Sequence, residues 1–284
     1  MITKRPETKV SIDGEDIELK SFVFSGGEVQ VRLCGCAPSV FSSKPDSYLT
    51  SRLATVTSHI FSANQLMETL LVLDALDFSY HPHIVELIIP YLPYSRQDRV
   101  CYPGESFALR VIGKMLDRSN VSKIITWDVH SPAAIEHVPN LTSVPASEFF
   151  SKFPVNHTDV LVAPDAGAVS RVWECCKTLG NQHMIALKKR SPEDGSLAIT
   201  DMTNISHIGD RDFIIVDDIC DGGRTFVNLA RELRAFTNGK IRLYVTHGIF
   251  SNGFDDLLKH IDEVWVANPW PSLELPEQVR ILPQ

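Results

Sequence analysis

The chain lacks the features that mark several large classes of protein. No apolar run approaches the roughly 20 residues that a helix needs to span a bilayer, so we expect no membrane segment. Its first residues contain no apolar stretch of a secretory signal, and we therefore expect a cytoplasmic protein. A Gly-x-x-x-x-Gly-Lys-Ser/Thr stretch is also missing, so any bound nucleotide is not held by a P-loop.

Cysteine and positive charge are both scarce. Six cysteines are scattered over 284 residues without the paired spacing of a zinc site, and we interpret them as small buried residues. The formal net charge of -8 at pH 7 argues against nucleic acid as a partner, although a local basic site for a phosphorylated ligand is compatible with it. The composition, 44% hydrophobic and 22% charged, is typical of a globular protein with a substantial core.

From about residue 54 onward, short apolar runs of strand length alternate with segments of helical periodicity. The expected strands are 55–60, 84–89, 123–127, 160–163, 183–187, 213–216, 243–247 and 264–267. The expected helices are 64–76, 106–116, 167–178, 225–236 and 253–260. This alternation predicts an α/β fold of mainly parallel sheets flanked by helices, with binding loops at the carboxyl ends of the strands.

The alternating pattern occurs twice in succession. A proline-rich stretch around 139–154 separates the two runs, so we expect two domains of similar size, at 1–140 and 141–284. Near the start, strand-like segments at 17–24 and 28–33 flank Ser25-Gly26-Gly27, which predicts a hairpin.

The most informative segment is 213–226, in which an apolar strand is followed by two carboxylates and then by a glycine pair that opens a helix. Glycine permits the sharp turn, and free N–H groups at a helix start attract a phosphate. Asp217 and Asp218 stand where they can bind ribose hydroxyls. Taken alone, the segment is also compatible with an ordinary strand-turn-helix corner whose acids are solvated.

Polar clusters follow two strands of the first half. The string Arg-Gln-Asp-Arg at 96–99 comes after strand 84–89 in a setting rich in proline and tyrosine, where guanidinium and amide groups can bind a purine or its phosphates. Asp128 and His130 follow strand 123–127 and can coordinate a phosphate-bound Mg²⁺. The simpler alternatives are a charged surface loop for the first cluster and a structural histidine for the second.

Two more clusters follow strands of the second half. Asp165 stands at a strand-to-helix corner among small residues, where the backbone can approach a diphosphate and the acid can meet a cation. Lys188-Lys189-Arg190 begins a polar loop and can neutralise phosphoryl oxygens, although a basic triplet is usually just solvated. The combination of several such clusters in one chain favours a site for phosphates and magnesium.

In these motifs the chain resembles the ribose-phosphate diphosphokinase family, also called phosphoribosyl pyrophosphate synthetases. The motifs are 24–28, 64–68, 90–99, 128–130, 164–167, 188–190 and 217–221, in the family's order. The resemblance implies two pseudo-symmetric phosphoribosyltransferase-like domains, each a mainly parallel sheet flanked by helices, with the active site between them. It also implies a homo-oligomer, at least a dimer, in which the hairpin of Phe24 and Glu28 helps to form a neighbour's adenine pocket.

The implied reaction transfers the β,γ-diphosphoryl group of ATP to the anomeric 1-hydroxyl of ribose 5-phosphate, giving phosphoribosyl pyrophosphate and AMP, with Mg²⁺ as cofactor. The resemblance implies ATP binding by Phe24, Glu28, Arg96, Gln97, Arg99 and His130, and Mg²⁺ binding by His130 and Asp165. It implies transition-state stabilisation by Lys188 and Arg190 from a mobile loop. It implies ribose binding by Asp217 and Asp218 and binding of the 5-phosphate end by Asp221, Gly222, Gly223, Arg224 and Thr225.

The chain departs from the family at the phosphate loop, which usually reads Asp-Asp-x-x-Asp-Thr-x-Gly-Thr. Gly222 replaces the first threonine and Arg224 replaces the glycine. This change suggests either a monophosphate held by arginine or a larger 5-substituted ribose such as ADP-ribose, which would place the enzyme in NAD metabolism. Gly26 also stands where the family usually has Asp or Asn near adenine.

Two further alternatives are a phosphoribosyltransferase and a non-catalytic relative that regulates an active partner. A phosphoribosyltransferase does not account for the 96–99 string together with Lys188 and Arg190. Regulatory relatives tend to lose catalytic cations or magnesium ligands, whereas Lys188, Arg190, His130 and Asp165 are all present. The sequence therefore favours an active ATP-dependent diphosphotransferase.

Overall fold

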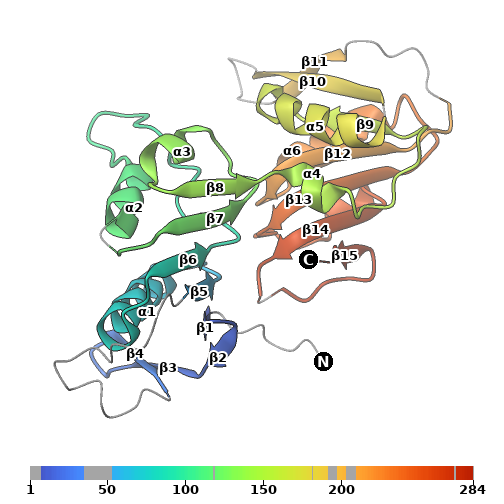
Figure 1. Ribbon diagram of the computed structural model, residues 1–284. Helices are drawn as coiled ribbons and strands as arrows, with labels where there is room; N and C mark the ends of the chain where they lie inside the picture. The colour runs from blue at the N-terminus through green and yellow to red at the C-terminus, as the bar shows by residue number, and fades with distance from the viewer. Residues whose placement is uncertain are drawn as a thin grey trace. The chain divides into compact units, whose positions relative to one another are not determined.

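The computed structural model describes residues 8–34, 53–117, 119–180, 182–190, 197–202, 209–271 and 273–283; for 178–179, 182–190 and 197–202 it describes the backbone alone. It divides into two compact units, Met1–Val144 and Pro145–Gln284 (Figure 1). None of the described helices is long and apolar enough to cross a membrane.

The first unit contains a six-stranded sheet in the order β2-β1-β5-β6-β7-β8. Its strands are β1 (Thr8–Ile12), β2 (Glu15–Ile17), β5 (Leu53–Ser58), β6 (Ile84–Ile88), β7 (Lys123–Trp127) and β8 (Leu141–Val144). Its helices are α1 (Ala63–Tyr80), α2 (Ala108–Asp117) and α3 (Ala133–His137). Strands β5 to β8 run parallel, and β1 and β2 add antiparallel at one edge.

Helix α1 shows how local sequence sets an element of this unit. Ser62 caps its start by accepting a hydrogen bond from the Gln65 backbone N–H at 3.3 Å, and Gln65 reaches back to the Phe61 N–H at 2.7 Å. His81 ends it in the left-handed conformation, with φ of 47°. Its buried face packs into the core of the sheet, while the hairpin of β3 (Leu19–Val23) and β4 (Val29–Leu33) also packs against it.

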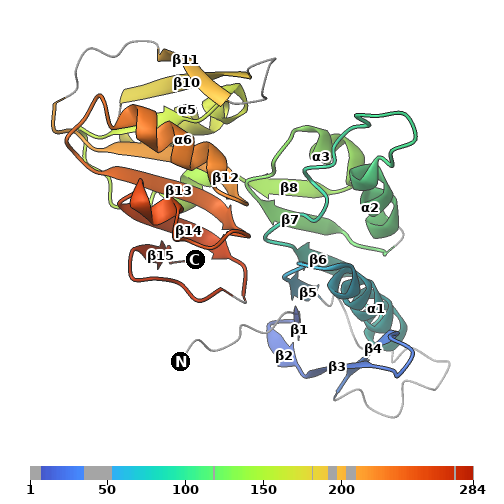
Figure 2. The same ribbon diagram turned by 180° about the vertical axis from the view of Figure 1, so that it is seen from behind.

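The second unit contains a seven-stranded sheet in the order β11-β10-β9-β12-β13-β14-β15. Its strands are β9 (Val160–Ala163), β10 (Gln182–Arg190), β11 (Leu197–Met202), β12 (Phe213–Cys220), β13 (Ile241–Gly248), β14 (Glu263–Pro269) and β15 (Val279–Ile281). All neighbours pair in parallel except β10 with β11. Helices α4 (Ala146–Phe150) and α5 (Val169–Leu179) cover one face in Figure 1, and α6 (Arg224–Leu233) covers the other in Figure 2.

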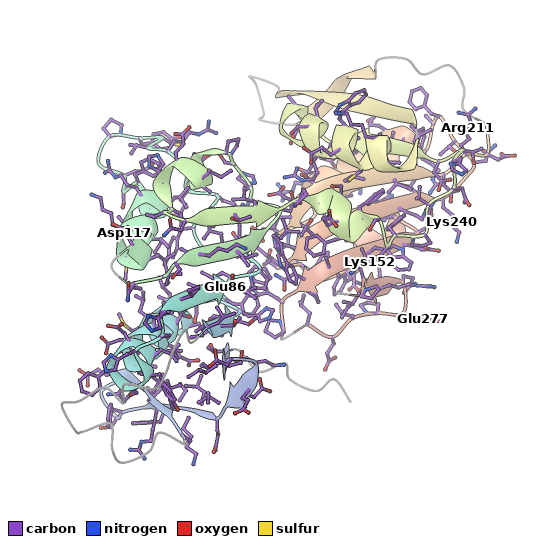
Figure 3. All side chains as sticks on the ribbon, viewed as in Figure 1. Glu86, Asp117, Lys152, Arg211, Lys240 and Glu277 are labelled. Carbon is purple, nitrogen blue, oxygen red and sulfur yellow. The ribbon has the colours of Figure 1, made fainter. Side chains whose placement is uncertain are left out.

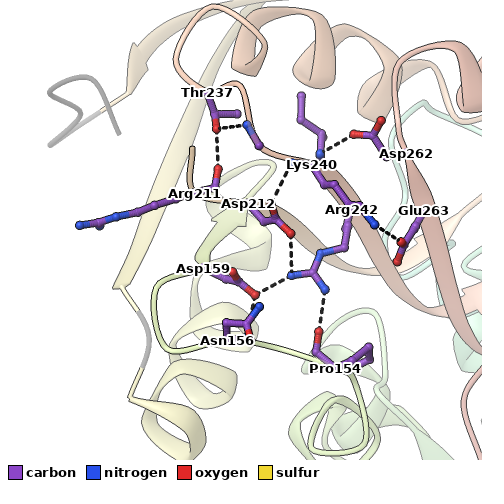
Figure 4. Close-up of polar contacts among 12 residues, drawn as sticks. Pro154, Asn156, Asp159, Arg211, Asp212, Thr237, Lys240, Arg242, Asp262 and Glu263 are labelled. Carbon is purple, nitrogen blue, oxygen red and sulfur yellow. Dashed lines mark hydrogen bonds and ion pairs between the residues drawn. The ribbon is translucent and has the colours of Figure 1, made fainter. Parts of the chain in front are cut away.

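The amino ends of β12 and β13 are closed by charged residues, with Arg211 and Lys240 labelled there in Figure 3. Arg242 is 6% exposed and pairs with Asp159 and Asp212, and it donates to the Pro154 carbonyl at 2.6 Å (Figure 4). This cluster ties the segment before β9 to the central strands, so the opposite, carboxyl ends of β9 and β12 are held on a fixed frame.

The expected α/β fold of mainly parallel sheets flanked by helices is confirmed, as is the hairpin, but three local expectations are wrong. Strand 213–216 continues to Cys220, because β13 keeps pairing with it as far as Gly248. Segment 253–260 is not an α-helix and contains only the 3₁₀ turn Leu257–Lys259, since Phe250 and Gly253 adopt left-handed φ of 48° and 69° just before it.

The third wrong expectation concerns residues 188–190, which were expected to begin a loop. Their backbone belongs to β10 and pairs antiparallel with β11, as in the partners Lys189 and Ala198. The sequence pattern also left out the edge strands β2, β8, β11 and β15, the strand β1 beside β2, and the short helices α3 and α4. Edge strands need no two-sided apolar run, so they leave a weak signal in the sequence.

Candidate functional site

The second unit carries a strand-turn-helix arrangement at residues 217–225, here called the β12 corner. Asp217 and Asp218 lie in the second half of β12, which ends at Cys220, and α6 begins at Arg224 directly after the turn. Gly223 has φ of 75°, and its carbonyl accepts hydrogen bonds from Phe226 and Val227 at 3.0 and 3.1 Å. Glycine is therefore required here by the backbone conformation, which an L side chain rarely adopts.

Arg171 of α5 faces both carboxylates of the β12 corner. Its Nη1 lies 3.3 Å from Oδ1 of Asp217, and its Nη2 lies 3.8 Å from Oδ1 of Asp218. The three side chains are 10%, 15% and 7% exposed, so the interaction is shielded from water and salt far better than a surface ion pair. Arg171 was not predicted as a site residue from the sequence, although its place one turn before the buried Cys175 indicated the covered face of the helix.

The surroundings of Asp217 shift its pKa. Burial raises the pKa of Asp217 well above its ordinary value, the neighbouring Asp218 charge raises it further, and Arg171 opposes both effects. Carboxylate oxygens accept hydrogen bonds from hydroxyl groups, and a sugar diol presents two such groups side by side.

Asp165 lies beyond the end of β9, the strand adjacent to β12. Its Oδ1 accepts hydrogen bonds from the N–H groups of Gly167 and Ala168 at 3.0 and 3.3 Å, which fixes the carboxylate at the start of a 3₁₀ turn. Strands β10, β9 and β12 are neighbours with parallel register, so Asp165 and the β12 corner lie at the same edge of the sheet.

The backbone of residues 188–190 ends β10 at that edge. Ile185 pairs with Ala163 of β9, so residues 188 and 190 follow the point where β9 stops. Their side chains lie outside the described residues. The second unit thus brings three sequence-predicted clusters to one end of its sheet: Asp165, residues 188–190 and the β12 corner.

The first unit brings two other clusters together at the carboxyl ends of β6 and β7. The loop after β6 contacts β7 directly, because the Trp127 N–H donates to the Pro90 carbonyl at 3.0 Å. Arg96, Gln97 and Arg99 are exposed on that loop. His130 is exposed after β7, just beyond Asp128, which is buried with φ of 40°. A positive φ at a non-glycine residue stores strain and often occurs at functional sites.

Phe24 and Glu28 lie in a different part of the first unit, at the tip of the β3–β4 hairpin. The Phe24 N–H donates to the Glu28 carbonyl at 2.8 Å, and Phe24 is 52% exposed. Ser21 links the hairpin to α1 by donating to Glu68 at 2.7 Å. The hairpin is a separate two-stranded sheet, whereas Arg96, Gln97 and His130 follow neighbouring strands of the main sheet.

Within the described residues, no group of three or more histidine, cysteine, aspartate or glutamate side chains is gathered for a metal ion. The carboxylate of Asp165 and the imidazole of His130 are suitable donors, but each stands in its own cluster. A cation held partly by the phosphates of a nucleotide needs only one or two protein ligands, and each of these residues is chemically suited to be such a ligand.

Comparisons with known proteins agree for both halves of the chain. Residues 15–119 match the family described as the N-terminal domain of ribose phosphate pyrophosphokinase, and residues 146–262 match the phosphoribosyl transferase domain. Two relatives named ribose-phosphate pyrophosphokinase are those of Pyrococcus abyssi and Haemophilus ducreyi. The first is 32% identical over 73% of this chain and 72% of its own length, and the second is 30% identical over 91% and 81%.

A solved structure supports the fold. The crystal structure of phosphoribosylpyrophosphate synthetase from Mycobacterium smegmatis superposes with a TM-score of 0.74 at 23% identity, covering 94% of this chain and 86% of that one. The similarity therefore extends over both units and is not confined to one shared domain.

Proposed function

Because the chain belongs to the ribose-phosphate pyrophosphokinase family, we propose that it transfers the diphosphoryl group of ATP to the 1-hydroxyl of ribose 5-phosphate. The observation that carries this proposal is the pair of carboxylates, Asp217 and Asp218, which share the mostly buried Arg171. They lie just before α6, the helix that a glycine opens. Carboxylates can accept hydrogen bonds from a diol, and backbone N–H groups at the start of a helix can bind a phosphate. The β12 corner therefore matches the two ends of a sugar phosphate.

The β12 corner binds and orients the acceptor in this proposal. Asp217 and Asp218 accept hydrogen bonds from the ribose hydroxyls, which fixes the ring. Residues Asp221 to Thr225 bind the phosphate on the 5-carbon through backbone N–H groups at the start of α6. With both ends held, the 1-hydroxyl is oriented before reaction, and positioning of this kind supplies much of the rate enhancement of phosphoryl transfer.

The first unit supplies the nucleotide contacts. Arg96 and Gln97 bind adenine and phosphates from the loop after β6, with Arg99 and His130 nearby in the same unit and Phe24 and Glu28 on the hairpin. The hairpin residues act on the adenine of a neighbouring copy, which makes the functional form a homo-oligomer. Mg²⁺ would be held by the ATP phosphates with His130 and Asp165, and it supplies neutralisation of phosphate charge.

The chemical step needs no covalent enzyme intermediate. The sugar 1-oxygen forms a bond to the β-phosphorus, the bond between that phosphorus and the bridging oxygen to the α-phosphate breaks, and AMP leaves with that oxygen. The 1-hydroxyl releases its proton to solvent, because AMP leaves with its phosphate ionised. Lys188 and Arg190 neutralise the negative charge that spreads over the transferring oxygens, which lowers the barrier electrostatically.

A second acceptor is favoured by one observation, the exposed Arg224 in the first turn of α6. A guanidinium at this position can bind a second phosphate, as in a ribose whose 5-carbon carries a diphosphate ester. ADP-ribose is the probe for that class. The enzyme would then perform the same transfer on a larger acceptor, in NAD metabolism.

One assay tests both acceptors. The chain is incubated with ATP and Mg²⁺ and with either ribose 5-phosphate or ADP-ribose, and AMP and the diphosphorylated sugar are measured by mass spectrometry. Formation of AMP with equal consumption of one sugar supports the proposal and names the acceptor. A chain that forms no diphosphorylated sugar from either would be a regulatory relative or a phosphoribosyltransferase, and the proposal would be wrong.

The role of Arg224 is tested by comparing two arginines of one helix face. Arg231 lies two turns after Arg224 on α6 and is also exposed, so Arg231→Ala is a matched control. We expect Arg224→Ala to raise the KM for the preferred acceptor about tenfold, since a charge-assisted contact to phosphate is lost. Equal kinetics of the two variants would show that Arg224 does not bind the acceptor.

A further inference from the structure

Asn252 occupies the space that a side chain at residue 222 would need. A Cβ atom placed on Gly222 would lie 2.8 Å from Nδ2 of Asn252 and 3.9 Å from Oγ of Ser251. The same Nδ2 donates a hydrogen bond to the Gly222 carbonyl oxygen at 3.1 Å. The glycine therefore opens no extra room in the β12 corner, because a side chain from another loop occupies it.

The preceding residue of the corner is held by the same loop. Ser251 donates its hydroxyl to Oδ1 of Asp221 at 2.7 Å, and its backbone N–H donates to the Asp221 carbonyl at 3.2 Å. Two successive residues of the corner, Asp221 and Gly222, are thus lined by two successive residues of the loop that follows β13. This loop, residues 250–253, is called the 250–253 turn.

The 250–253 turn is built as a rigid support. Phe250 adopts a left-handed φ of 48°, and its ring is buried and lies 4.7 Å from the ring of Phe254. Gly248 makes room for that ring, because a Cβ there would lie 2.2 Å from it. Gly253 closes the turn with φ of 69° and donates to the Phe250 carbonyl at 2.9 Å. Asn252 is therefore exposed on a base that the core fixes.

We propose that Asn252 is a specificity-determining residue of the acceptor site, where its carboxamide takes the place of the side chain missing at Gly222 and donates to the phosphate on the 5-carbon of the sugar. The inference rests on the proposed function, in which residues 221–225 bind that phosphate. An asparagine amide has two N–H donors, and the Gly222 carbonyl uses one of them. The second N–H is suited to an anion, and a neutral donor beside an anion adds affinity without another charge.

The first experiment measures binding of ribose 5-phosphate by calorimetry without ATP, for the full chain and three variants. Asn252→Asp is nearly isosteric but places a carboxylate beside the phosphate, so we expect the Kd to rise about tenfold or more. Asn252→Ala removes the donor alone and should raise the Kd about threefold to tenfold. Asn238→Asp is the control, because Asn238 is exposed in the same unit, at the opposite ends of the strands, and should change the Kd less than about twofold.

The second experiment tests the shared space. Gly222→Thr alone forces a side chain onto Asn252 and should weaken binding, whereas Gly222→Thr combined with Asn252→Gly frees that space and should restore it. A double variant that binds no better than Gly222→Thr would contradict this account. Thermal midpoints of all variants establish that each is folded.

The outcomes separate this inference from the proposed function. If the wild-type chain binds ribose 5-phosphate and Asn252→Asp binds it equally well, the inference is wrong whether or not the chain forms AMP. If Asn252→Asp binds ribose 5-phosphate more weakly, as expected, but the wild-type chain forms no AMP, Asn252 is confirmed as an acceptor contact and the proposed reaction fails. If the wild-type chain binds neither ribose 5-phosphate nor ADP-ribose, both are overturned.

Discussion

Nη1 of Arg171 lies 3.3 Å from Oδ1 of Asp217, although the two residues are 46 positions apart in the chain. The contact joins α5, the helix after β9, to the second half of β12. Strands β9 and β12 are neighbours, and the proposed metal ligand Asp165 and the proposed acceptor ligands lie at the same end of both. Arg171 is mostly buried, so its positive charge stabilises the negative charges of Asp217 and Asp218 at a place that solvent hardly reaches. We infer that it keeps Asp217 charged and correctly oriented for the sugar.

Replacing Arg171 by methionine should therefore impair acceptor binding more than catalysis with saturating acceptor. Without the guanidinium the pKa of Asp217 rises further, and the protonated acid is a poorer acceptor of hydroxyl hydrogen bonds. We expect the KM for the sugar to rise about tenfold or more, with the KM for ATP unchanged. Arg171→Lys retains the charge and should recover part of the loss. If methionine and lysine variants behave alike, the charge of Arg171 has no role.

The raised pKa of Asp217 predicts opposite pH trends for affinity and for stability. Sugar binding needs the ionised carboxylate, so the acceptor KM should fall as pH rises through the raised pKa. A group whose pKa is higher in the folded than in the unfolded state contributes stability that is complete below its unfolded pKa and is lost as pH rises through its folded pKa. The thermal midpoint should therefore fall over the same window.

Asp217→Asn is the control for both trends, because it removes the titrating group while keeping the side-chain shape. Acceptor KM and thermal midpoint are measured for both proteins across that pH window. Parallel pH trends of affinity and stability in the wild-type chain would contradict this account of Asp217.

The parallel sheets were predictable because central strands such as β9 are buried on both faces and leave continuous apolar runs. The contacts of Arg171 and Asn252 could not be predicted in this way, since each residue bonds to an element far away in sequence. The full length of β12 could not be predicted either, because Asp217 and Asp218 are poor strand formers, and pairing with β13 keeps them extended. Local periodicity carries no information about such contacts.

Lys188 and Arg190 are predicted to act on the transition state. Residues alternate between the two faces of a strand, so positions 188 and 190 of β10 share one face and position 189 lies on the other. We expect Lys188→Ala and Arg190→Ala each to lower kcat by about 10²-fold, as for loss of a charge-stabilising donor. Lys189→Ala is the matched control and should retain most activity. Equal effects at all three positions in steady-state assays would mean that only the local charge matters.

The buried cluster around Arg242 should set the stability of the second unit. Asp159 is 3% exposed and pairs with Arg242, so Asp159→Ala leaves a buried cation without its main partner (Figure 4). Such losses cost about 3–5 kcal/mol, far more than a surface pair contributes. Urea denaturation should show a clear drop in the midpoint for Asp159→Ala and almost none for Lys259→Ala, which breaks the exposed pair with Asp256. Similar midpoints for the two variants would contradict the importance of the cluster.

Gly113→Ala tests how α2 and α3 pack in the first unit. In an isolated helix this change would stabilise by about 1 kcal/mol, because alanine is the better helix former. Here a Cβ on Gly113 would lie 1.8 Å from the carbonyl oxygen of His137 at the end of α3, a distance that real atoms do not tolerate. Backbone cannot move aside as a flexible side chain can, so α3 must shift away from α2 and its buried Ala134 must lose contacts.

We therefore expect the sign of the Gly113→Ala effect to be reversed, with a loss of about 1–3 kcal/mol in the free energy of unfolding. Lys114→Ala, at the next and exposed position of the same helix, is the control and should be close to neutral. Because α3 follows the loop of His130, the displacement should also raise the KM for ATP while leaving sugar binding unchanged. A Gly113→Ala chain that is more stable than wild type would show that α2 and α3 do not pack as closely as described.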